Sequence, residues 1–112
     1  MAIADKDQVF TDEAIRVNTT VNSSVAETGE FNAQTVVVYN DLDKDVVIQL
    51  QGSIDNGTNW LDIGSPFTIT TLTKDYDTVT DYFPCYRVTA KCATAPTTGD
   101  LSVWILKAGA TT

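Results

Sequence analysis

The chain has 112 residues, 43% of them apolar, and fifteen acidic against seven basic residues give it a net charge of −8. That length predicts a single domain with one core, and the negative charge opposes binding to nucleic acid or to anionic lipid. No apolar run approaches the ~20 residues of a membrane helix, and the first ten residues lack the apolar region of a secretory signal, so no membrane partner is expected.

The first twelve residues, 1–12, are polar and lack any period. They predict an N-terminal arm, followed by one β domain over residues 13–112. Because the arm has too little apolar surface to fold alone, we expect it to order on a neighbouring subunit or on another protein of the assembly, so that its deletion leaves the melting temperature nearly unchanged. Residues 13–28 mix β-branched residues with Asn, Ser and Thr, which predicts one or two short strands.

The middle of the chain carries the clearest strand signals. Residues 34–40, QTVVVYN, are apolar on both faces and predict a strand that is covered on both sides. Alternation from Val46 predicts a half-buried strand after the polar turn at 41–45. The residues Asp55-Asn56-Gly57 tolerate positive φ and predict a tight turn, with the partner strand returning near Trp60.

Further strands are predicted over residues 66–73, 78–83, 85–92 and 101–106, with a turn at 94–99. About seven or eight short strands at roughly ten-residue spacing, without a helical period, indicate an all-β fold. We therefore predict an antiparallel β-sandwich of immunoglobulin or jelly-roll type. Period-two spacing selects its core: Val36, Val38, Ile48, Leu50, Trp60, Val88, Val103 and Ile105.

The two cysteines, Cys85 and Cys92, are seven residues apart. On one strand they would face opposite ways and lie ~23 Å apart, whereas a disulfide needs Cα atoms within about 7 Å. Both are therefore expected to be free packing residues. With no histidine and no further cysteine, a zinc site is not expected.

Three aspartates, Asp41, Asp43 and Asp45, resemble the start of a calcium loop. An EF-hand also requires glycine at its sixth position and glutamate at its twelfth, where this chain has Val46 and Gly52. A looser calcium site shared with a neighbouring loop stays open. The alternative is a solvated turn whose charges discourage edge-to-edge pairing, and this is the interpretation we favour.

Five aromatic residues could include a platform for stacking sugar rings: Trp60, Tyr39, Tyr76, Tyr82 and Trp104. Such a platform needs several exposed rings on one sheet face. Because Trp60 and Trp104 stand in apolar contexts, and aromatic side chains contribute most when buried, we expect core packing instead.

Nothing in the chain indicates catalysis. Histidine is absent, the carboxylates fall mostly in turns, and no phosphate-binding loop is present. We expect no enzyme activity, no catalytic residue, no cofactor and no bound metal. The sequons at Asn18, Asn22 and Asn56 are expected to be chance occurrences, because no secretory signal precedes them.

Two segments carry a family resemblance. The first is the hairpin with Gly52-Ser53, the turn at 55–57 and Trp60. The second combines Tyr86-Arg87-Val88-Thr89-Ala90 with the closing run from Thr98 to Ile105. Over about residues 35–107 the chain resembles small β-sandwich virion proteins of tailed bacteriophages. Fibronectin type III and discoidin-like modules share parts of the pattern, but the chain lacks the early tryptophan of the former and is too short for the latter.

The resemblance implies a capsid decoration protein, or another head or tail auxiliary, located in the virion after assembly in the host cytoplasm. The partners that the resemblance implies are further copies of the chain and the major capsid protein or another virion protein. A homotrimer is the first expectation, and a dimer is the second. A carbohydrate-binding or adhesion module is the alternative function.

Overall fold

The structure, a computed structural model, describes residues 2–27, 33–79 and 83–110. These residues form nine strands and no helix that could cross a membrane. The strands are β1 (Ala2–Glu13), β2 (Val21–Asn22), β3 (Ala26–Glu27), β4 (Ala33–Asn40), β5 (Val46–Ser53), β6 (Leu61–Ile69), β7 (Thr73–Val79), β8 (Cys85–Lys91) and β9 (Leu101–Ala110).

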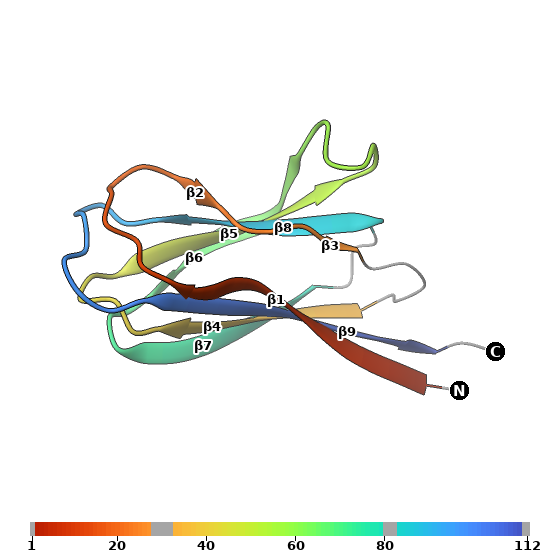
Figure 1. Cartoon of the computed structure of the whole chain (residues 1–112). Helices are drawn as coiled ribbons and strands as arrows, with labels where there is room; N and C mark the ends of the chain where they lie inside the picture. The colour runs from red at the N-terminus through yellow and green to blue at the C-terminus, as the bar shows by residue number, and fades with distance from the viewer. Residues whose placement is uncertain (1, 28–32, 80–82, 111–112) are drawn as a thin grey trace.

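Two sheets face each other, as Figure 1 shows. Sheet A has the order β1-β9-β4-β7, and sheet B has the order β2-β8-β5-β6, with β3 also pairing with β8. Every pairing is antiparallel. The predicted all-β antiparallel sandwich is therefore confirmed.

The core lies between the sheets and follows the alternation of the strands. On β4, Val36 and Val38 are buried, and on β5 Ile48 and Leu50 face them from the other sheet. Val88, Val103 and Ile105 are buried as predicted. The turn prediction is confirmed as well, since Asn56 and Gly57 have φ values of 58° and 87°.

Trp60 is the exception among the predicted core residues, because it is only half-buried. It precedes β6 in the hairpin that projects from sheet B in Figure 1. There the guanidinium carbon of Arg87 lies 4.4 Å from the ring centroid. The prediction of core packing is wrong for Trp60, because the projecting hairpin carries it away from the space between the sheets.

The predicted N-terminal arm also differs from the structure. Residues 2–13 are strand β1, which pairs along its length with β9. A register shift after Gln8 accompanies two consecutive buried side chains, Val9 and Phe10. The segment thus obtains its apolar contacts and backbone hydrogen bonds from the sandwich itself. Deleting residues 1–12 should consequently lower the melting temperature, contrary to the expectation from the sequence.

Three strands depart from their predicted form. β4 is covered on one face only, with Tyr39 38% exposed on the other. The runs around Ile63 and after Pro66 join into the single strand β6, where proline is tolerated because β6 is an edge strand. β7 ends at Val79, and residues 80–82 of the strand predicted over 78–83 lie outside the described residues.

Candidate binding surfaces

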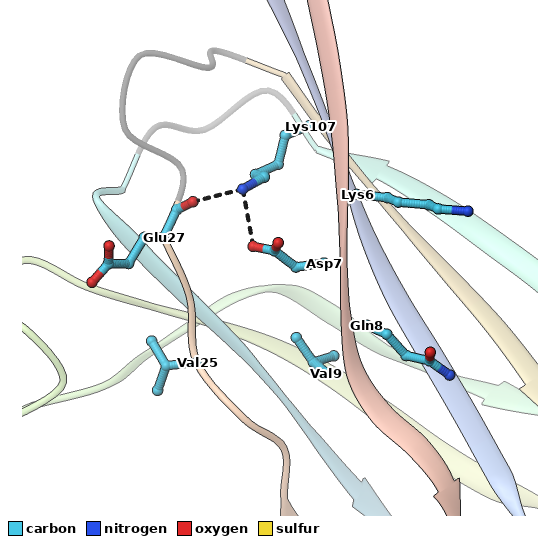
Figure 2. A pocket seen from close by; sticks show the side chains of 7 residues that line it. All are labelled: Lys6, Asp7, Gln8, Val9, Val25, Glu27 and Lys107. Carbon is cyan, nitrogen blue, oxygen red and sulfur yellow. Dashed lines mark hydrogen bonds and ion pairs between the residues drawn. The ribbon is translucent and has the colours of Figure 1, made fainter.

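An open hollow of about 590 Å³ separates the outer edge of β1 from β3, and is called here the β1–β3 groove (Figure 2). Asp7 and Val9 point from β1 into the groove, toward Val25 and Glu27, whereas Lys6 and Gln8 point to the opposite side of the strand. The lining residues are Lys6, Asp7, Gln8, Val9, Val25, Glu27 and Lys107. The groove therefore combines two valines with charges of both signs.

Lys107 closes one end of the groove. Although it carries a charge, it is only 5% exposed. Its Nζ donates to Asp7 Oδ2 and to the carbonyl oxygen of Glu27, both at 2.9 Å, as the dashed lines in Figure 2 show. These bonds satisfy a buried ammonium and connect sheet A to the β3 segment of sheet B.

Gln34 occupies the register position opposite Lys107 on β4. It is 1% exposed, and its side-chain amide has no hydrogen-bond partner among the described residues. Sequence reasoning missed this polar end of the sandwich, because Asp7, Gln34 and Lys107 are scattered along the chain and only sheet pairing brings them together.

β1 is an edge strand of sheet A. Its inner side pairs with β9, and no described strand pairs with its outer side, which faces the groove. At one point the Val9 carbonyl accepts a hydrogen bond of 3.1 Å from the Ser24 N–H. Open strand edges of this kind can accept an extended segment of another chain as an additional strand.

The outer face of sheet A gathers most of the predicted aromatic residues. In register, Trp104 on β9 stands beside Val37 on β4, which stands beside Tyr76 on β7. The rings of Tyr39 and Trp104 meet edge to face at 4.8 Å and 67°. The Lys74 Nζ lies 4.7 Å from the Tyr39 ring centroid.

A shallow hollow of about 340 Å³ on this face is lined by Lys6, Val37, Tyr39, Trp104 and Leu106. Tyr76 is 67% exposed, and Trp104 is half-buried and lies outside the buried core. The expectation of core packing is therefore wrong for Trp104 as well, because β4 and β9 have no layer over their outer face in the described structure. Trp60 lies in the β5–β6 hairpin that projects from the other sheet, and Tyr82 lies outside the described residues.

The tip of the β5–β6 hairpin is fixed by side-chain hydrogen bonds. Asp55 accepts from the backbone N–H of Asn59 at 2.9 Å, from Asn59 Nδ2 at 2.8 Å and from Ser53 Oγ at 2.8 Å. These bonds, with that from the Asn59 backbone first, lower the pKa of Asp55 from 3.8 to about 2. The aspartate that the sequence marked as a turn former thus organises the whole loop.

The aspartates of the turn at 41–45 do not converge on one point, since Asp43 and Asp45 bond to different loops. Asp43 accepts from the hydroxyl and the backbone N–H of Thr97, which lower its pKa to about 2. Asp45 accepts from the Thr71 N–H at 2.9 Å, and Asp41 is exposed. In the described ranges no group of three His, Cys, Asp or Glu side chains is placed to hold a metal ion.

Cys85 and Cys92 are free thiols, as predicted, and both are buried. Cys92, directly after β8, belongs to the core cluster with Tyr86, Val88 and Ala90, whereas Cys85, the first residue of β8, does not. The two side chains therefore lie on opposite faces, as the alternation predicts. Burial raises the pKa of both thiols.

No family model and no curated protein sequence matches the chain. Among solved structures, the PBSX exported protein XepA aligns with a TM-score of 0.71 at 14% identity, over 98% of this chain and 38% of that one. The chain therefore spans well under half of XepA. The SPBc2 prophage-derived protein YomS aligns at 0.56 and 16% identity over 96% of both chains.

A structure of Bacillus endospore appendages, described as disulfide-linked pili, aligns with a TM-score of 0.60 at 16% identity, over 95% of this chain and 87% of that one. At such identities the likeness establishes a shared fold. The resemblance to bacteriophage β-sandwich proteins is accordingly supported at the level of the fold.

Proposed function

We propose that the chain is a non-enzymatic structural subunit of a bacteriophage particle, and specifically a capsid decoration or auxiliary protein. The observation that carries the proposal is the open outer edge of β1 along the β1–β3 groove. The fold shared with XepA and YomS supports a phage context.

Strand addition is the binding mode that suits this groove. Backbone groups on the edge of β1 would pair with an extended segment, while side chains of that segment meet the lining. Val25, which is 50% exposed, offers apolar contact, and Asp7 and Glu27 would select partners by charge. The donated segment comes from another copy of this chain or from the major capsid protein. Closed symmetry, with a trimer as first choice and a dimer next, would limit growth into fibres.

Two exposed valines provide a matched test. Val25 lines the groove and is 50% exposed, whereas Val17 is 46% exposed and does not line it. Val25→Trp should fill the groove and reduce incorporation into purified particles at least about tenfold, which corresponds to a loss of roughly 1.4 kcal/mol in binding. Val17→Trp should be incorporated like the wild type. Equal incorporation of both variants would contradict docking in the groove.

A further inference from the structure

The outer face of sheet A presents side chains in three rows across its strands. The middle row runs from Gln8 through Trp104 and Val37 to Tyr76. One flanking row is Lys6, Leu106, Thr35 and Thr78, and the other contains Ser102, Tyr39 and Lys74. The face therefore combines aromatic rings from β9, β4 and β7 with amide, hydroxyl and ammonium groups.

We propose that this face binds a neutral oligosaccharide, with Trp104 and Tyr76 as the stacking rings. In register the two are separated by one strand, which puts them ~10 Å apart, a spacing that allows alternate units of an extended glycan to lie over the two rings. Tyr39 acts as a positioning residue, because its edge-to-face contact holds the Trp104 ring and Lys74 already covers one of its own faces.

The chemistry of the face selects the ligand class. Pyranose rings with equatorial hydroxyls, such as glucose and N-acetylglucosamine, expose apolar C–H groups that pack on aromatic rings. Their hydroxyls can accept hydrogen bonds from the Gln8 amide and the Lys74 ammonium group. The net charge of −8 opposes acidic polysaccharides, so a neutral glycan is the better match.

The size of the hollow on this face also suits a small ligand. The hollow beside Trp104, about 340 Å³, falls within the range of small-ligand sites, roughly 300–1,000 Å³.

The test is titration of the full chain with cellohexaose and with chitohexaose, followed by calorimetry and by tryptophan fluorescence. Saturable binding of at least one oligosaccharide is expected. Tyr76→Ala, at a 67% exposed position, and Trp104→Ala should each weaken it about tenfold. Trp60→Ala, in the hairpin that projects from sheet B, is the control and should leave the affinity unchanged.

Absence of saturable binding at millimolar concentrations of both oligosaccharides would overturn the proposal, as would unchanged affinity in Tyr76→Ala and Trp104→Ala. Sedimentation provides a further test. If the wild type formed dimers and Tyr76→Ala did not, the face would bind a second copy of the chain, and the glycan proposal would be overturned. The result is separable from the role in particles, because Val25→Trp should still bind the glycan and Tyr76→Ala should still enter particles.

Discussion

Gly99 lies so close to Asp41 that a Cβ atom at position 99 would stand 1.8 Å from the Asp41 carbonyl oxygen. Gly99 also has a φ of +86°. The two loops are held together by hydrogen bonds from the Asp41 N–H to the Asp100 carbonyl, 3.0 Å, and from the Asp43 N–H to the Thr98 carbonyl, 3.2 Å. This contact fixes the loop before β5 against the loop before β9.

Gly99→Ala should therefore destabilise the fold by at least about 3 kcal/mol, because it adds a backbone clash to an unfavourable φ. Gly64→Ala is the control, since Gly64 has a φ of +68° but no atom within 4 Å of the added Cβ. It should cost only about 1–2 kcal/mol. Urea denaturation measures both, and equal losses would show that the loops are not packed as described.

The Asp7–Lys107 ion pair predicts a non-additive pair of substitutions. Asp7→Ala removes the carboxylate partner of a buried ammonium and should cost about 1–3 kcal/mol, a reduced value because the Asp7 side chain is 37% exposed. Adding Lys107→Met removes the buried charge and should recover part of that loss. Chemical denaturation of the two single variants and the double variant gives the coupling. Strict additivity would mean that the pair contributes nothing.

Acid should weaken the fold through Asp43 and Asp55. Hydrogen bonds lower the pKa values of both carboxyl groups from 3.8 to about 2. The largest contribution comes from the Thr97 hydroxyl for Asp43 and from the Asn59 backbone N–H for Asp55. A carboxyl with a lowered folded-state pKa contributes stability above its unfolded pKa and loses it as the pH falls through the folded one. The melting temperature should thus fall between about pH 4 and pH 2. The double variant Asp43→Asn, Asp55→Asn should flatten that slope, and an unchanged slope would contradict these hydrogen bonds.

The two thiols should react slowly in the native protein. Burial raises the pKa of Cys85 and of Cys92, so little thiolate is present at neutral pH. An unfolded thiol ionises at about pH 8.5, whereas the buried thiols stay protonated to a higher pH. The free energy of unfolding should therefore fall as the pH rises above about 8.5. Mass spectrometry after alkylation should find both cysteines unmodified in native protein and both modified after unfolding. Rapid native alkylation, or a disulfide between them, would contradict the buried free state.

Local patterns in the sequence predict the architecture well. The turn at Asn56 and Gly57 follows from their tolerance of positive φ, and Val36 and Val38 follow from period two. The strand β1 could not be predicted in this way, because its sequence is polar and it forms a strand by pairing with β9. The partner of Asp7 is Lys107, which is 100 residues away in the sequence.

The candidate sites were predicted less well. An apolar context around Trp104 indicates burial, but local sequence does not say which face of a strand lacks a covering layer. The groove depends on the separation between β1 and β3, two segments joined by no strand pairing. Such surfaces are properties of sheet order, which periodicity does not specify.

The measurement that tests the proposed structural role most directly is the copy number of this chain in purified phage particles, determined by quantitative mass spectrometry against the major capsid protein. The structural role predicts many copies per particle, in a fixed ratio to the capsid protein that persists through repeated density-gradient purification. Particles that lack the chain after such purification would contradict it.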